Sequence, residues 1–184
     1  MKKVVVVYYS MYGAAGWYAQ WIAQAVDGEL IDARRQPLTE KQLISYELVV
    51  FGGGLYAGQL SGLRGMARRD PSRLILFTVG LSDPLHSPPK GFLDKYFDEN
   101  AQKQLRLFHL RGALNPRTLS LPHRLALAAF RGMILRKPKN QRSQLEQRLL
   151  TGFGNPLNFI DQSSIAPIVA EIRRRLEAPQ EGMR

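Results

Sequence analysis

The sequence predicts one α/β domain built on a doubly wound, five-stranded parallel sheet. Three observations predict it: strand and helix patterns alternate along the 184 residues, the strongest strands are continuous apolar runs, and three strands lead into glycine. Such alternation is typical of parallel strands that are joined by helices. Continuous apolar runs indicate strands that are covered on both faces.

The individual elements follow from the same patterns. The segment 3–9, KVVVVYY, is β-branched and aromatic and is expected in the centre of the sheet. Thr39 is expected to cap the second helix. The expected strands are 3–9, 29–33, 48–51, 73–79 and 105–110, and the expected helices are 16–26, 38–44, 63–69, 92–104 and 165–176.

One segment exceeds this minimal pattern. About 50 residues, 113–164, separate the fifth strand from the last helix. Bare loops of that length are uncommon in compact domains, so helices are expected at 123–135 and 144–150. We therefore expect a single domain over 1–184 that carries a helical insertion over about 113–164.

The insertion is also where the charge gathers. The net charge is +11, and between residues 111 and 150 nine basic residues face one acidic residue, Glu146, which gives +8. A basic region of this kind attracts phosphate, anionic lipid or acidic protein, and a solvated basic face is the alternative.

The expected helix at 123–135 is amphipathic. Leu127, Phe130 and Ile134 lie toward one side, with Arg124 and Arg131 nearby. A basic amphipathic helix can lie on an anionic membrane surface, and it can equally cap the core of its own domain. Both interpretations stay open from the sequence.

Composition excludes several classes of function. The chain has no cysteine, which excludes disulfides, thiolate metal sites and cysteine nucleophiles, so redox chemistry needs a bound cofactor. The three histidines lack ligand spacing, so no metal site is expected. No nucleic-acid-binding motif is present, and no nucleic-acid partner is expected.

No apolar run approaches the roughly 20 residues of a membrane span. The N-terminal apolar run stops at Ser10 and is expected to be a strand rather than a secretory signal. We expect a cytoplasmic protein, with a peripheral position at the inner face of the membrane if the basic insertion binds lipid.

Candidate binding residues lie in three loops that follow strands. Ligands of doubly wound sheets bind outside the carboxyl ends of the strands. The first loop combines small residues, a hydroxyl and a helix N-terminus, which suits a phosphate monoester held by backbone amides. It contains neither G-x-x-x-x-G-K-S/T nor G-x-G-x-x-G. Its residues are Ser10, Met11, Tyr12, Gly13, Ala14 and Ala15.

The other two loops suit a flat ligand. Residues 52–54 are three consecutive glycines that permit close approach, and Tyr56 is placed to stack on a ring. The loop at 78–83 adds small and polar contacts, and His86 and Asp83 are weaker candidates for a proton donor. Three such loops predict a planar, phosphorylated ligand. The candidates here are Leu55, Tyr56, Ala57, Gly58, Thr78, Val79, Gly80 and Ser82.

Several of these motifs resemble a known family. The segment 8–13, YYSMYG, is similar to the phosphate loop of flavodoxin-like FMN proteins, especially the quinone oxidoreductases first described as tryptophan-repressor-binding proteins. The segments 53–59 (GGLYAGQ), 78–82 (TVGLS) and 110–114 (LRGAL) resemble the flavodoxin-domain family that includes menaquinone-dependent protoporphyrinogen oxidase. The resemblance spans roughly residues 2 to 178.

The resemblance implies a flavodoxin-like fold with strand order 2-1-3-4-5 and one bound FMN. It places the phosphate on residues 10–15 and the isoalloxazine between the loops of Tyr56 and Gly80. It implies an oxidoreductase that transfers electrons or hydride to or from a quinone or a porphyrinogen-like substrate. The alternative is a flavodoxin-type electron carrier, against which the charge of +11 argues because such carriers resemble acidic proteins.

The phosphate loop departs from the family pattern. Typical flavodoxins carry threonines near it, where this chain has Met11, Ala14 and Ala15. Up to three hydroxyl bonds are absent, each worth about 1 kcal/mol net. We therefore expect FMN to bind through backbone amides and with lower affinity.

Overall fold

The computed structural model describes residues 2–36, 39–56, 59–66, 69–82, 90–152 and 154–177. Its centre is a parallel sheet in the order β2-β1-β3-β5-β6, with a short β4 paired antiparallel to the end of β3. Counted along the five long strands, this is the predicted order. The strands are β1 (Val4–Tyr9), β2 (Glu29–Asp32), β3 (Leu48–Tyr56), β4 (Gln59–Leu60), β5 (Leu74–Gly80) and β6 (Arg106–Arg111).

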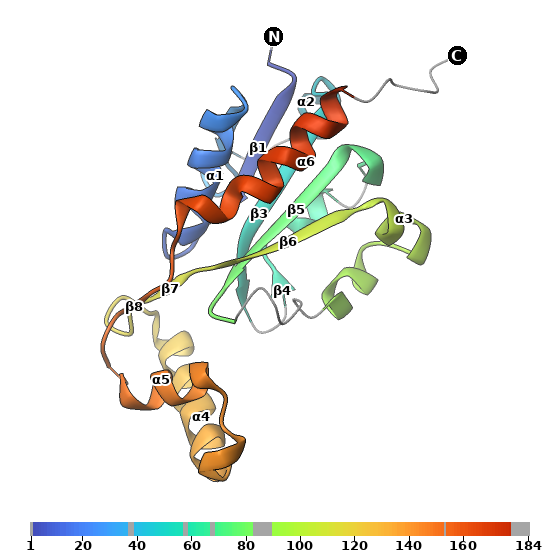
Figure 1. The fold of residues 1–184 in the computed structure, drawn as a ribbon. Helices are drawn as coiled ribbons and strands as arrows, with labels where there is room; N and C mark the ends of the chain where they lie inside the picture. Colours follow the sequence, from blue (N-terminus) through green and yellow to red (C-terminus); the bar gives the residue numbers. More distant parts are fainter. Residues whose placement is uncertain are drawn as a thin grey trace.

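Helices cover both faces of this sheet (Figure 1). Helices α1 (Ala14–Ala25) and α6 (Ala166–Glu177) pack on one face. The other face is covered by α2 (Glu40–Ile44), α3 (Glu99–Gln104) and two 3-10 segments, η1 (Leu63–Met66) and η3 (Lys90–Lys95). A further 3-10 segment, η2 (Pro71–Arg73), leads into β5.

Strand β1 shows why the sheet has two cores. Val4 and Val6 pack with α1 and α6, whereas Val5 and Val7 pack with the opposite layer. All four are at most 2% exposed, so the continuous apolar run is covered on both faces as predicted.

Three elements differ from the sequence prediction. Where a helix is expected at 63–69, the structure has the 3-10 segment η1 at Leu63–Met66. The strand expected at 48–51 continues through the glycines to Tyr56. A Cβ at Gly52 would lie 2.1 Å from the ring of Phe77, so glycine is what lets this ring pack across β3. The helix expected at 92–104 is divided into η3 and α3, because the Asp98 carboxylate accepts a bond from the Ala101 amide at 2.7 Å and begins a new helix.

The insertion leaves the sheet through a two-stranded ribbon. Strands β7 (Ala113–Leu114) and β8 (Leu157–Asn158) pair antiparallel, and Figure 1 shows α4 and α5 side by side beyond the carboxyl edge of the sheet. The predicted helices are confirmed as α4 (Leu121–Arg136) and α5 (Gln144–Thr151), joined by η4 (Lys139–Gln141), and η5 (Gln162–Ile165) leads into α6.

The base of the insertion is tied to the sheet by hydrogen bonds. The Phe159 amide donates to the Gly112 carbonyl at 3.1 Å. The buried Tyr18 hydroxyl donates to the Arg111 carbonyl at 2.7 Å and accepts from the Asp161 amide at 3.1 Å. The outgoing and returning chains are therefore held next to each other.

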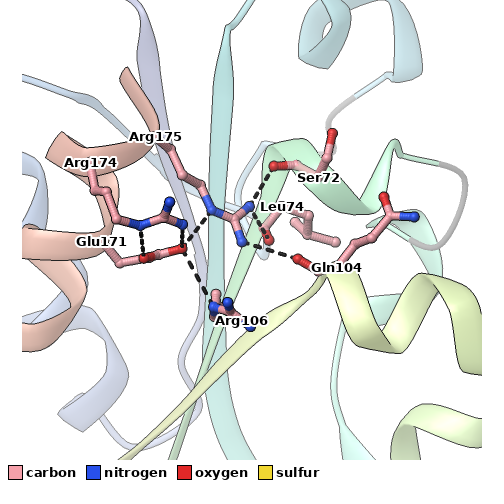
Figure 2. A network of polar contacts seen from close by, with 7 residues as sticks. All are labelled: Ser72, Leu74, Gln104, Arg106, Glu171, Arg174 and Arg175. Carbon is pink, nitrogen blue, oxygen red and sulfur yellow. Dashed lines mark hydrogen bonds and ion pairs between the residues drawn. The ribbon is translucent and has the colours of Figure 1, made fainter. Parts of the chain in front are cut away.

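Helix α6 is anchored at the opposite edge of the sheet, where β5 and β6 begin (Figure 2). The Arg175 guanidinium donates to the carbonyls of Ser72, Leu74 and Gln104 and to the Glu171 carboxylate. One arginine thereby joins the last helix to three other segments.

Candidate functional site

A cavity of about 460 Å³ lies at the carboxyl edge of the sheet, within the size range of small-molecule sites. The ends of β1, β3, β5 and β6 line one side, and α4 lines the other. The lining residues are Ser10, Tyr12, Ala14, Ala15, Gly54, Leu55, Val79, Gly80, Leu81, Gly112, Ala113, Leu114, Asn115, Leu119, His123, Ala126, Leu127 and Phe130.

The sequence-predicted residues fall into several groups in the structure. Seven line this cavity: Ser10, Tyr12, Ala14, Ala15, Leu55, Val79 and Gly80. Met11 and Gly13 line a second cavity on the other side of the β1 loop, residues 10–15. Thr78 and Ser82 are bonded to a buried histidine rather than lining the cavity. The side chain of Tyr56 and the residues Ala57, Gly58, Asp83 and His86 lie outside the described part of the chain.

The β1 loop has the donors that a phosphate needs. Gly13 has φ +95° and ψ −37°, and its amide donates to the Ser10 Oγ at 3.0 Å, which leaves the Ser10 hydroxyl proton for a ligand. No side chain caps the N-terminus of α1. The first amides of a helix have no partner within it, so those of Ala14 and Ala15 are directed toward the cavity end of the loop.

The rest of the cavity suits a flat, mostly apolar ring. Leu55, Val79, Leu127 and Phe130 provide apolar surface, and the described lining residues include no lysine or arginine. A Cβ at Gly112 would lie 2.8 Å from the Val79 side chain, so glycine keeps this end of β6 close to β5. The residues present therefore fit an apolar ring that carries a phosphate.

His109 on β6 contacts both β5 and the residues that follow it. Its Nδ1 lies 2.8 Å from the Thr78 Oγ1 and its Nε2 lies 2.9 Å from the Ser82 Oγ. Thr78 donates to the Phe108 carbonyl, so its oxygen accepts the Nδ1–H and Nε2 accepts from Ser82. Burial lowers the pKa of His109 and so disfavours the charged form of the ring. His109 is 7% exposed and belongs to strand β6.

The insertion contacts the β1 loop directly across the cavity. The Tyr12 hydroxyl lies 2.5 Å from His123 Nδ1 on α4, and the Ser120 amide donates to the same hydroxyl at 3.3 Å. The two rings meet edge to face, with centroids 5.6 Å apart. Residues more than one hundred positions apart in sequence therefore meet at one corner of the site.

A second cavity of about 520 Å³ lies between the β1 loop and β2. Trp17 lies at the rim of this cavity and is 54% exposed. Arg34 donates to the Ser10 carbonyl at 2.8 Å and so holds the outer side of the loop.

Comparison with known proteins agrees with this geometry. The family model described as a flavodoxin domain matches residues 5–141, about three quarters of the chain. The chain belongs to the flavodoxin domain family. That membership indicates a flavin cofactor and a redox role for the protein.

Two further comparisons complete the picture of this flavodoxin domain. One solved structure aligns with this chain at 16% identity and a TM-score of 0.39. It is the crystal structure of a protein from Bacteroides uniformis ATCC 8492 that is provisionally named a flavoprotein. The alignment covers 60% of this chain and 88% of that chain, and no conclusion is drawn from the likeness. No curated protein matches the sequence.

Sequence reasoning missed much of the lining of this flavodoxin domain. Gly112 and Asn115 follow the fifth strand, so the rule that carboxyl ends carry the site was sufficient to find them. Leu119, His123 and Phe130 belong to the insertion, and no local pattern indicates that α4 folds back over the sheet edge. Among the described residues no cluster could hold a metal ion, and no helix is long and apolar enough to cross a membrane.

Proposed function

We propose that this chain is an FMN-dependent oxidoreductase that transfers electrons or hydride to or from a quinone or a porphyrinogen-like substrate. The observation that carries the proposal is the 460 Å³ cavity, which combines an uncapped helix N-terminus with apolar walls. FMN has a phosphate at one end and a flat ring at the other, and the two parts of the cavity complement them.

Each part of the chain has a role in this proposal. The amides of Ala14 and Ala15 and the Ser10 hydroxyl would hold the phosphate without a cationic side chain. Leu55 and Gly80 would flank the isoalloxazine. FMN supplies two-electron redox chemistry when bound, and the protein orients it and excludes water.

Helix α4 favours an enzyme over an electron carrier. A carrier needs only an exposed flavin edge that a partner protein can approach, whereas here α4 contributes Ala126, Leu127 and Phe130 to the cavity. An enclosed apolar site favours a small planar substrate. The net charge of +11 also opposes docking to a basic partner protein.

Calorimetric titration of the apoprotein with FMN, riboflavin and FAD tests the cofactor. We expect one FMN per chain, bound on the order of 100-fold more tightly than riboflavin because the phosphate gains charge-assisted bonds. FAD should bind more weakly than FMN. Equal affinity for riboflavin and FMN would contradict a phosphate site in the β1 loop, and a flavin spectrum that is absent after dialysis against FMN would contradict the whole proposal.

We also propose that the insertion meets an anionic membrane surface, which would bring a lipid-soluble quinone to the cavity. Leu121, Leu125 and Met133 on α4 are each more than 60% exposed, and the segment 111–150 that contains them has nine basic residues and one acidic residue. Exposed apolar side chains among basic residues complement anionic lipid headgroups and the acyl region beneath them. Other side chains of the same helix line the cavity, so surface and site adjoin.

A further inference from the structure

Two side chains in the cavity stand out by their chemistry. Among the described residues that line it, Tyr12 and His123 are the two whose side chains are ionisable. The remaining lining is aliphatic, aromatic, glycine, one serine and one asparagine. Any proton that a lining side chain exchanges with a bound molecule near neutral pH therefore passes through this pair.

The pair is arranged for proton transfer. The Tyr12 oxygen lies within hydrogen-bond distance of His123 Nδ1, and the two rings also meet edge to face. The Ser120 amide donates to the Tyr12 oxygen at 3.3 Å. The Ser120 hydroxyl lies 3.3 Å from the same oxygen and 3.2 Å from His123 Nδ1, so it adjoins both members of the pair. When Nδ1–H donates to the Tyr12 oxygen, the phenol proton is directed at another acceptor.

Reduction of a quinone needs such a donor. A quinone that takes a hydride gains two electrons and one proton and becomes a hydroquinone monoanion. Its charged oxygen must take a second proton, and a positioned acid commonly accelerates that kind of transfer by about 10²–10⁴-fold. Among the cavity residues that the structure describes, no other side chain is such an acid.

We propose that Tyr12 and His123 form a proton-donating pair for the substrate reduced in this cavity, an inference that rests on the proposed function. The Tyr12 O–H proton passes to the charged substrate oxygen while the His123 imidazolium passes its Nδ1 proton to the Tyr12 oxygen. The substrate gains one O–H bond, Tyr12 ends as the neutral phenol, and His123 ends as the neutral imidazole. Solvent then restores the imidazolium.

The first test compares two acceptors in single-turnover reoxidation of the FMN-loaded, dithionite-reduced protein. Menadione requires protons on reduction, whereas ferricyanide takes one electron and no proton. Tyr12→Phe and His123→Gln should each slow menadione reduction on the order of 100-fold and leave ferricyanide reduction unchanged. Tyr9→Phe is the matched control. Tyr9 ends β1, three residues before Tyr12, and does not line the cavity.

A second readout does not depend on flavin. In ¹⁵N-histidine-labelled apoprotein, Tyr12→Phe should shift the Nδ1 resonance of His123, and Tyr9→Phe should leave it in place. A D₂O solvent isotope effect on menadione reduction should be present in the wild type and absent with ferricyanide.

The outcomes separate the pair from the proposed function. Equal menadione rates in wild type and both variants, with normal FMN binding, would overturn the pair alone. Equal losses with menadione and ferricyanide would also overturn it, because they would indicate a structural role. A wild-type protein that binds no FMN would overturn the proposed function and the pair together.

Discussion

Gly13 and Gly154 adopt the same unusual backbone angle in different places. Both have φ +95°, and a Cβ at either position meets nothing within 4 Å. The cost of a side chain at either residue is therefore mainly backbone strain, on the order of 1–3 kcal/mol. Gly13 lies in the β1 loop and Gly154 does not, so a substitution at Gly154 is a control for the backbone strain of the same substitution at Gly13.

We expect Gly13→Val to abolish most flavin binding and Gly154→Val to leave it intact. The valine at 13 displaces the amides of Ala14 and Ala15 from the phosphate, at a cost on the order of 3 kcal/mol or about 100-fold in affinity. Both variants should lose similar folding stability. FMN titration and thermal melting of the two proteins check this, and equal flavin affinity in them would remove the β1 loop from the site.

At the scale of the element, α4 has two different faces. Ile134 is 1% exposed and Phe130 borders the cavity, whereas Leu121, Leu125 and Met133 lie open to solvent. The sequence left a membrane surface and a core cap as alternatives. Ile134 is buried but belongs to neither of the two core clusters of the sheet, and the exposed residues Leu121, Leu125 and Met133 form the face for which we propose a lipid surface.

Binding to anionic vesicles tests that second face. Wild-type protein should sediment with vesicles that contain phosphatidylserine at low salt and less at high salt, because surface charges are screened beyond roughly 8 Å at physiological ionic strength. Replacing Arg124, Arg131, Arg136 and Lys137 by Gln should remove up to about 4 kcal/mol of binding. Flavin binding should persist in this variant, because none of the four lines the cavity.

Ile134→Ala is the complementary variant. It should lower the free energy of unfolding by about 2–4 kcal/mol through loss of buried surface, whereas Met133→Ala should have little effect. If the wild-type protein does not sediment with anionic vesicles at low salt, α4 has no role in binding lipid.

Particular elements show how far sequence reasoning reaches. The strand order, the N-cap at Thr39 and the helices of the insertion were predicted, because each depends on local patterns or on the resemblance. The path of β3 through Gly52 and the contact of Tyr12 with His123 were not, because each depends on a side chain distant in sequence. The side of the cavity formed by the strand ends is therefore predictable from a rule of the fold. The side formed by α4 is not, because it depends on how the insertion packs against the sheet edge.

At the scale of the whole molecule, Glu171 on α6 reaches the sheet through an ion pair, because its carboxylate lies 3.7 Å from the Arg106 guanidinium on β6. Its carboxylate accepts two bonds from Arg174 at 2.8 Å and one from Arg175 at 2.8 Å (Figure 2). Chiefly through the bonds from Arg174, the pKa of Glu171 is lowered to about 2. Stability from this carboxylate is thus present above its unfolded-state pKa near 4.5 and is lost as the pH falls toward 2.

We expect Glu171→Gln to lower the free energy of unfolding at pH 7 by on the order of 2 kcal/mol. The variant should also lose less stability than the wild type between pH 4.5 and 2, since it has no carboxylate to protonate there. Glu47→Gln is the control, because Glu47 pairs with Lys3 at a more exposed site. Urea melts across this pH range check the result, and parallel curves for wild type and Glu171→Gln would contradict it.

The two ends of the insertion lie close together, so the insertion can be removed or exchanged without moving the strands of the sheet. The Phe159 amide and the Gly112 carbonyl are 3.1 Å apart, so a short turn can span the gap if residues 113–158 are removed. Tyr18 would still bond to Arg111 and Asp161 on the two sides of the junction. The entropy cost of closing a loop rises only slowly with loop length, so a longer or different insertion lowers the stability of the sheet only slightly. An exchanged insertion would therefore alter the α4 side of the cavity and the exposed apolar face of α4, while the strand ends on the other side of the cavity stay in place.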